Sequence, residues 1–151
     1  MLLKIVSPQG IIFEGKVEKV QIPTDVGLIG ISPNHTPFSS IVIPGITKIL
    51  PTEKKWSEVL SSAEFLFEQD EINISLGQGI VYLDGSTILM LVSSATTNPK
   101  TDKQTLEDMK KQLEEKIAEI KVKWDIEEIE KAYLSLQKLT SDLKLLKLKK
   151  H

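Results

Sequence analysis

Residues 80–92 read Ile80-Val81-Tyr82-Leu83-Asp84-Gly85-Ser86-Thr87-Ile88-Leu89-Met90-Leu91-Val92. Two apolar runs flank an Asp-Gly pair, and this arrangement is a strong short-range signal for two antiparallel strands joined by a tight turn. We therefore predict a β-hairpin with strands over 80–83 and 87–92 and a turn at 84–86.

The chain before this hairpin repeats the pattern of short β-branched runs separated by turns that contain glycine or proline. Further strands are expected at Leu3-Lys4-Ile5-Val6, Ile11-Ile12-Phe13, Val17-Glu18-Lys19-Val20-Gln21-Ile22 and Ile41-Val42-Ile43. Many short strands with regular turns predict an antiparallel sandwich or barrel, and they do not alternate with helical patterns as a parallel α/β fold would require. Residues 1–97 are predicted to form an N-terminal antiparallel β-sandwich domain.

Beyond residue 97 the apolar period changes from that of strands to that of helices. One apolar stripe comprises Leu106, Met109, Leu113, Ile117, Ile120 and Trp124, and a second comprises Ile129, Tyr133, Leu136, Leu139, Leu143 and Leu146. Thr101 with Gln104, and Asp125 with Glu128, are typical of helix starts. The very short connection predicts antiparallel helices, so residues 98–151 are expected to form a C-terminal α-helical hairpin.

Two segments fit the pattern less well. The Leu50–Gln69 segment starts with a polar break, and its second part fits either an amphipathic helix or an extra hairpin. Gly77-Gln78-Gly79 resembles the start of a dinucleotide fingerprint, but no third glycine and no following helix support that interpretation. A bulge or tight turn in the sheet is favoured there.

Composition narrows the range of functions. A net charge of −2 shows no basic excess for nucleic-acid binding. Cysteine is absent. All 19 basic residues are lysines, so no arginine guanidinium is present to bind a phosphate with two parallel hydrogen bonds. No phosphate-cradling loop or nucleophile elbow occurs, and His35 with His151 alone does not make a zinc site. We expect no catalytic residue, no metal, no cofactor and no nucleic-acid partner.

Residues 5–45 strongly resemble the N-terminal β-sandwich of F-type ATP synthase epsilon subunits. The matching elements are Ser7-Pro8 with Gly10, Phe13 with Gly15, the Val17–Pro23 strand, Gly27, Gly30-Ile31, Pro33-Asn34-His35-x-Pro37 and Pro44-Gly45. Their order and spacing are specific as a set, and a β-sandwich followed by a helical hairpin is also the architecture of that family.

The resemblance implies a non-catalytic central-stalk subunit that couples rotation of the c ring to the gamma subunit and the catalytic head during proton-driven ATP synthesis. Such a subunit lies on the cytoplasmic side of the bacterial cell membrane and associates with the membrane only through the complex. The implied contacts with the gamma subunit and c ring involve Val26, Leu28, Ile29, Gly30, Ser32, Pro33, Asn34 and His35. Leu28 and Ile29 are expected to be exposed, and His35 also fits a structural role in locking its loop.

The chain departs from the family pattern at informative positions. Val26 and Leu28 stand where acidic residues commonly face the c ring, and only Asp25 is charged there. The contact with the ring is therefore expected to be less electrostatic. Many bacterial members bind ATP through an I/L-D-x-x-R-A motif, but residues 106–111 read Leu-Glu-Asp-Met-Lys-Lys and lack its arginine and alanine. ATP binding is expected to be weak or absent.

Charge is divided unevenly along the helical hairpin. Residues 101–130 carry ten acids and six lysines, whereas residues 131–150 carry six lysines and one acid. Late lysines complement the helix dipole, and the remaining excess predicts contact with an acidic surface. By resemblance this surface belongs to the alpha/beta catalytic ring, where the hairpin would inhibit ATP hydrolysis. The candidate contacts are Lys131, Lys138, Lys144 and Lys147.

The alternative is another interaction protein with a coiled-coil hairpin, such as a transcription-elongation factor. That class needs acids at the hairpin tip, where Asp125, Glu127 and Glu128 lie. Here, however, the β-domain precedes the hairpin and carries the run that resembles the synthase subunits. A sugar-binding or enzymatic sandwich is disfavoured because the few aromatic residues are scattered along the chain.

Overall fold

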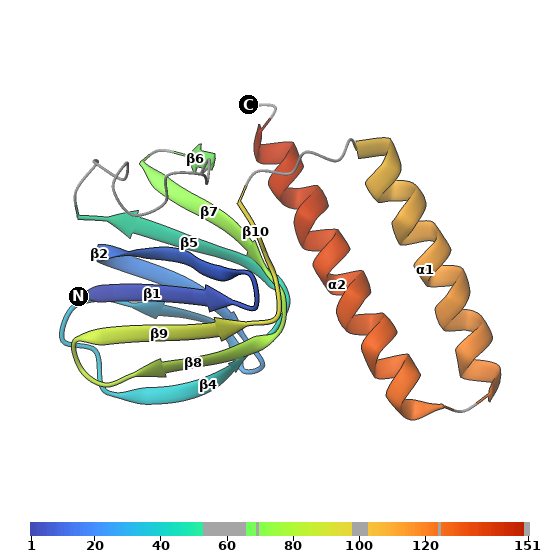
Figure 1. Ribbon diagram of the computed structural model, residues 1–151, viewed down its shortest axis with the longest axis horizontal. Helices are drawn as coiled ribbons and strands as arrows, with labels where there is room; N and C mark the ends of the chain where they lie inside the picture. The colour runs from blue at the N-terminus through green and yellow to red at the C-terminus, as the bar shows by residue number, and fades with distance from the viewer. Residues whose placement is uncertain (53–65, 69, 98–102, 124, 150–151) are drawn as a thin grey trace.

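The computed structural model describes residues 1–52, 66–68, 70–97, 103–123 and 125–149. Within them, strands are followed along the chain by two helices (Figure 1). The strands are β1 (Leu2–Ser7), β2 (Gly10–Thr24), β3 (Gly27–Ile31), β4 (Phe38–Val42), β5 (Gly45–Pro51), β6 (Leu66–Glu68), β7 (Glu71–Leu76), β8 (Gly79–Leu83), β9 (Thr87–Val92) and β10 (Ala95–Thr96). The helices are α1 (Lys103–Lys123) and α2 (Ile126–Lys149).

The long strand β2 is shared by both layers of the sandwich. Its first part pairs with β1, and its second part pairs with β3 and β5. The pair Thr24–Val42 joins its end to β4, so β1, β9, β8, β4 and β2 close into a ring. From β2 the sheet continues through β5 and β7 to β10. The pairings are antiparallel as predicted, except that β1 and β9 run parallel.

A single apolar core fills the sandwich, because alternate residues of each strand point inward. In β8, Val81 and Leu83 are buried while Ile80 and Tyr82 are exposed. All buried members of this core come from residues 3–92. The helical hairpin has separate apolar clusters formed between α1 and α2, around Leu106 with Leu143 and around Ile117 with Ala132.

Helix α2 lies against the sandwich, and α1 lies on the far side of α2 (Figure 1). The predicted start of α2 is confirmed, since the backbone N–H of Glu128 donates to Asp125 Oδ1 at 3.3 Å. Thr101 and Trp124 lie outside the described residues. Neither described helix combines the length and apolarity that crossing a bilayer requires.

Parts of the predicted apolar stripes are exposed. Met109 and Tyr133 are more than one third exposed, and the Tyr133 ring lies 5.3 Å from the ammonium of Lys121. Conversely, Leu145 lies outside the second predicted stripe and is fully buried. The stripes were assigned for a hairpin that packs only on itself, whereas α2 also buries a second face on the sheet.

Four strands, β3, β5, β7 and β10, were absent from the sequence prediction. In the Leu50–Gln69 segment, β5 continues to Pro51, and residues 66–68 form the short strand β6 on β7. The rest of that segment, 53–65 and Gln69, lies outside the described residues. Gly79 belongs to β8, where an added Cβ would overlap the carbonyl oxygen of Leu91. Close approach of two strands, and not a bulge, therefore explains this glycine.

Candidate interaction surfaces

The β2–β3 turn presents apolar side chains to solvent. Gly27 has φ +115°, in the region that favours glycine, and Thr24 Oγ1 donates a 2.6 Å hydrogen bond to its carbonyl oxygen. This turn projects Val26, which is 79% exposed, and Leu28, which is 64% exposed. Two of the eight predicted contact residues therefore form an apolar tip on a hydrogen-bonded hairpin.

Ile29 does not share this exposure. It pairs with Ile22, whose side chain is fully buried, so both point toward the core. Ile29 is accordingly half-buried and packs against the sandwich core, which makes the expectation of an exposed Ile29 wrong. The next residue, Gly30, is exposed, and an added Cβ there would meet nothing within 4 Å.

The remaining predicted residues lie at the other end of β3. Ser32, Pro33 and Asn34 are exposed, and the backbone N–H of His35 donates to the carbonyl of Ser32 at 3.2 Å. The His35 ring packs 5.3 Å from the Phe38 ring, and its Nδ1 lies 2.7 Å from the Thr36 carbonyl oxygen. These contacts give His35 a structural role in the loop. The eight residues thus line the length of β3 and do not form one patch.

A second surface covers the outer face of the layer formed by β4, β8, β9 and β1. Cross-strand neighbours Ile41, Ile80, Leu91 and Val6 follow one another across the four strands. Ile80 is 52% exposed and Tyr82, on the same face, 54% exposed. A shallow hollow of about 600 Å³ adjoins the row. We call this row, with Tyr82, the outer apolar face.

Sequence reasoning missed the outer apolar face although the signal was present. A half-buried strand normally alternates apolar and polar residues. In 80–83 and 88–92 the positions between the core residues are instead Ile80, Tyr82, Leu89 and Leu91. Strands that are apolar on both faces indicate that another element or a binding partner covers the second face.

Helix α2 meets the sheet through a polar seam. Ser75 of β7 is fully buried, and its hydroxyl lies 2.7 Å from Asp142 Oδ1 and 2.8 Å from Ser141 Oγ. Having one hydrogen, it donates to the carboxylate and accepts from Ser141. Lys138 Nζ donates to Asp142 at 2.6 Å and to Thr96 Oγ1 at 2.8 Å. Serine, aspartate, lysine and threonine thus join the hairpin to both β7 and β10.

Asn73 lies on the same face of β7 as Ser75. Its side chain is fully buried, and within the described part of the chain neither its amide nitrogen nor its oxygen has a hydrogen-bond partner. A buried polar group without a partner costs about 1–3 kcal/mol. The seam residues Ser75, Lys138 and Asp142 are therefore well paired, whereas the Asn73 amide beside them carries a desolvation cost.

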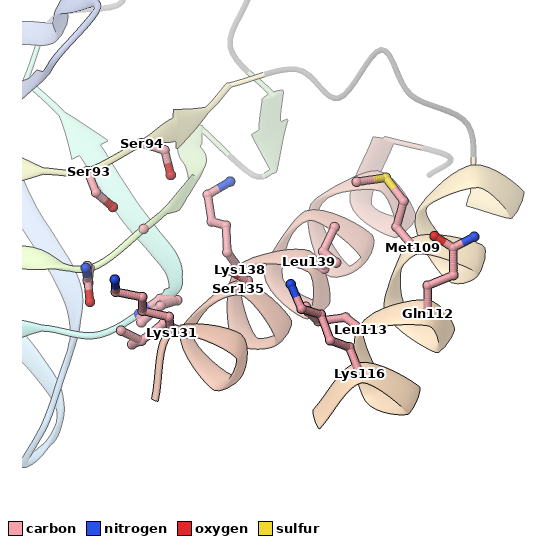
Figure 2. A pocket seen from close by; sticks show the side chains of 14 residues that line it. Ser93, Ser94, Met109, Gln112, Leu113, Lys116, Lys131, Ser135, Lys138 and Leu139 are labelled. Carbon is pink, nitrogen blue, oxygen red and sulfur yellow. The ribbon is translucent and has the colours of Figure 1, made fainter. Parts of the chain in front are cut away.

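The predicted regulatory lysines have different surroundings. Lys138 is held in the seam, whereas Lys131, Lys144 and Lys147 are exposed. Lys131 and Lys138 also line a cavity of about 840 Å³ between the two helices and the sandwich, together with Lys116 and the hydroxyls of Ser93 and Ser94 (Figure 2). None of the described residues that line this cavity is acidic. Lysines supply point charges and not guanidinium forks, so weak or absent ATP binding stays a prediction.

Comparison with known proteins agrees with this architecture. The family model described as "ATP synthase, Delta/Epsilon chain, beta-sandwich domain" matches residues 1–98. An ATP synthase epsilon chain of Persephonella marina is 30% identical over 118 residues, covering 76% of each chain. The chain belongs to the ATP synthase epsilon-chain family.

Other epsilon chains match beyond the sandwich. That of Clostridium novyi is 29% identical over 116 residues, covering 77% of each chain. That of Neisseria meningitidis is 26% identical over 147 residues, covering 97% of this chain and 92% of the relative. The similarity to epsilon chains therefore includes the helical hairpin.

A solved structure shows the same fold. A chain in the cryo-EM structure of the Euglena gracilis mitochondrial ATP synthase, which contains OSCP, F1 and the c ring, superposes with a TM-score of 0.69 at 14% identity. The match covers 100% of this chain and 81% of the other. The predicted epsilon-chain family and fold class are thus confirmed, and the transcription-elongation alternative has no support.

Proposed function

We propose that this epsilon-family chain is a non-catalytic central-stalk subunit that couples rotation of the c ring to the gamma subunit and the catalytic head. The observation that carries the proposal is the outer apolar face, which lies on the sandwich domain that the family model matches. Torque transfer requires a stiff body, and a close-packed sandwich with its own core meets this requirement.

The outer apolar face is the proposed docking site for the gamma subunit. Contiguous exposed apolar side chains on a soluble protein mark interaction sites, and aromatic residues are enriched at interfaces. Ile41, Ile80 and Leu91 follow one another in register, and Tyr82 lies beside them. A rigid sheet loses little conformational entropy on binding, so this face suits a permanent partner.

The β2–β3 tip is the proposed contact with the c ring. Val26 and Leu28 project from the turn, with Asp25 as the charged residue beside them. The backbone N–H of Asp25 donates to the Ile41 carbonyl at 3.2 Å, which ties the tip to β4. The contact is proposed to be largely apolar and to depend little on salt.

The helical hairpin is the proposed regulatory element. Docked on the sandwich it leaves Lys131, Lys144 and Lys147 exposed on α2. Released, it would reach an acidic surface of the alpha/beta ring and inhibit ATP hydrolysis. The unpaired Asn73 amide supports this reading, because it lowers the free energy needed to undock α2.

The proposed location is the cytoplasmic side of the bacterial cell membrane, with the membrane reached only through the complex. This location is supported by the bacterial relatives. The proposal that this chain is non-catalytic is supported by its sequence, which has neither a phosphate-binding loop nor a nucleophile elbow.

Binding to a purified gamma subunit tests the proposal. We expect one-to-one binding by the full chain, and we expect the double variant Ile80→Asp/Leu91→Asp to lose at least tenfold in affinity. Two charges would be buried without partners at the interface. Affinity is measured by calorimetry, and circular dichroism checks that the variant remains folded.

A matched control places the same charges on another apolar site. Val122 and Ile126, near the tip of the helical hairpin, are 79% and 68% exposed, so Val122→Asp/Ile126→Asp should bind gamma normally. Folded full chain that does not bind gamma would overturn the proposed function. Equal loss in both double variants would overturn the assignment of the face.

A further inference from the structure

A second cavity lies where the β2–β3 hairpin, β5 and α2 meet. Its volume is about 610 Å³, within the range of small-molecule sites. The described residues of its lining include two lysines, Lys48 of β5 and Lys144 of α2, and none of them is acidic. It is formed by different residues from the cavity between α1 and α2, apart from Pro44, which lines both.

The two lysines occupy one end of this cavity. Lys48 is the neighbour of Gln21 on β2, whereas Leu28 is the neighbour of Pro23, two residues further along β2. On α2, Lys144 lies two helical turns beyond Leu136. Ser141 meets Ser75, which is opposite Ile46, and from there α2 runs toward β6 (Figure 1), so Lys144 lies toward the Lys48 end. The cavity is therefore cationic at one end and apolar, with Leu28 and Leu136, at the other.

Neither lysine has a carboxylate partner in the part of the chain that the structure describes. Among the described residues, Lys48 and Lys144 form no ion pair, in contrast to Lys138, which is paired with Asp142. Lys48 is half-buried, which reduces the screening of its charge by water. Two unpaired ammonium groups at one end of a cavity attract an anionic group, and the apolar end favours a hydrocarbon body attached to it.

We propose that this cavity binds a small amphiphilic anion, with its phosphate or carboxylate between Lys48 and Lys144 and its alkyl or aromatic body against Leu28 and Leu136. Such a ligand touches the sandwich and α2 together. By linkage, it stabilises the docked hairpin in proportion to its occupancy. The site is independent of the proposed gamma and c-ring contacts, apart from Leu28.

Three probes test separately whether the anionic group and the apolar body of the proposed ligand contribute to binding. Octyl phosphate, inorganic phosphate and octanol are titrated into the full chain below the micelle concentration, with affinity read from backbone amide shifts by NMR. We expect octyl phosphate to bind at least tenfold more tightly than either other probe, and to shift the amides of Ile46 and Thr140. Equal affinity for inorganic phosphate or for octanol would overturn the amphiphilic site.

Charge variants locate the site. Lys48→Gln/Lys144→Gln should weaken octyl phosphate binding at least tenfold, because each lost charge-assisted hydrogen bond is worth about a factor of ten. Lys131→Gln/Lys147→Gln removes the same charge from α2 outside the cavity and should leave affinity within twofold. Equal losses in both double variants, or no saturable binding to the wild type, would refute the proposal, whatever the outcome of the gamma-binding test.

Discussion

Asn73 and Ser75 lie two residues apart on one face of β7, both are fully buried, and Ser75 contacts α2. Ser75 donates to Asp142, whereas both polar atoms of the Asn73 amide lack partners within the described chain. The same strand therefore both attaches the hairpin and weakens its attachment. An unpaired polar group is costly in the low dielectric of a protein interior.

Replacing Asn73 by leucine, which has a similar volume, should raise the free energy of unfolding by about 1–3 kcal/mol, since the unpaired amide no longer has to be desolvated. The measurement is urea denaturation followed by circular dichroism. In the assembled synthase the same change should weaken inhibition of hydrolysis, because α2 stays docked. A destabilised Asn73→Leu variant would show that the amide has a partner in solution.

Ser75→Ala provides the opposite control at the same seam. It removes the hydrogen bond to Asp142 and leaves a partly buried carboxylate with one partner fewer. Hydrogen bonds to charged groups are worth about 1.5–3 kcal/mol, so this variant should lose a comparable amount of stability.

Leu28 provides a test of the c-ring contact. Leu28→Asp should change the melting temperature little, because substitutions at exposed sites usually alter stability by less than about 0.5 kcal/mol. Proton pumping coupled to ATP hydrolysis in reconstituted vesicles should nevertheless fall. Val122→Asp, at another highly exposed apolar position, is the matched control. A large drop in melting temperature would place Leu28 in the core instead.

At the scale of elements, α2 has two kinds of lysine. Lys138 is tied to Asp142 and Thr96, so neutralising it would disturb docking as well as charge. Lys131, Lys144 and Lys147 are exposed and are the cleaner test of a contact with an acidic partner. This distinction depends on the fold and does not follow from the charge count.

Changing Lys131, Lys144 and Lys147 together to glutamine should relieve inhibition of ATP hydrolysis in the reconstituted complex. The remaining inhibition should also depend less on salt, since exposed charges act mainly on association rate. Hydrolysis is assayed across a salt series.

The matched control for this prediction is Lys110→Gln/Lys111→Gln/Lys116→Gln, which removes equal charge from α1. Its hydrolysis rate should match that of the wild type. If the α2 triple variant inhibits as well as the wild type at low salt, the lysines serve only the helix dipole.

Elements with a strong local signal follow from the sequence, and those fixed by distant partners do not. The Asp-Gly pair predicts β8 and β9 within one residue, and the Asp125 cap predicts the start of α2. Strand β7 has the alternation Ile72-Asn73-Ile74-Ser75, but both polar positions are buried, and Ser75 is buried against Ser141 and Asp142 of α2. The exposure of Ile29 was mispredicted because it depends on the pairing of β3 with β2.

At the scale of the whole molecule, the two halves have separate apolar cores. Residues 3–92 supply the buried core of the sandwich, and the two helical clusters draw only on the hairpin. The surfaces that meet at the seam carry Ser75, Thr96, Lys138 and Asp142. A polar seam between two separate cores is typical of domains that can part.

Truncation after Thr97 should therefore leave a folded sandwich that still binds gamma. Its Asn73 and Ser75 side chains would face water without penalty once α2 is gone. Circular dichroism and thermal denaturation of fragment 1–97 check this expectation, with the full chain as reference. An unfolded fragment would instead make the hairpin part of one shared core, and the boundary at 97 would be wrong.

The parallel pairing of β1 with β9 bears on how the protein is made. Residues 2–6 are synthesised long before residues 87–91, which complete one edge of their strand. At translation rates of about 5–20 residues per second, that edge waits roughly 4 to 17 s for its partner. Until then the buried residues Leu3 and Ile5 lack the neighbours that β9 supplies. The nascent sandwich thus exposes apolar surface and an unpaired strand edge, the features that make folding intermediates aggregation-prone, until β9 is available to close the ring.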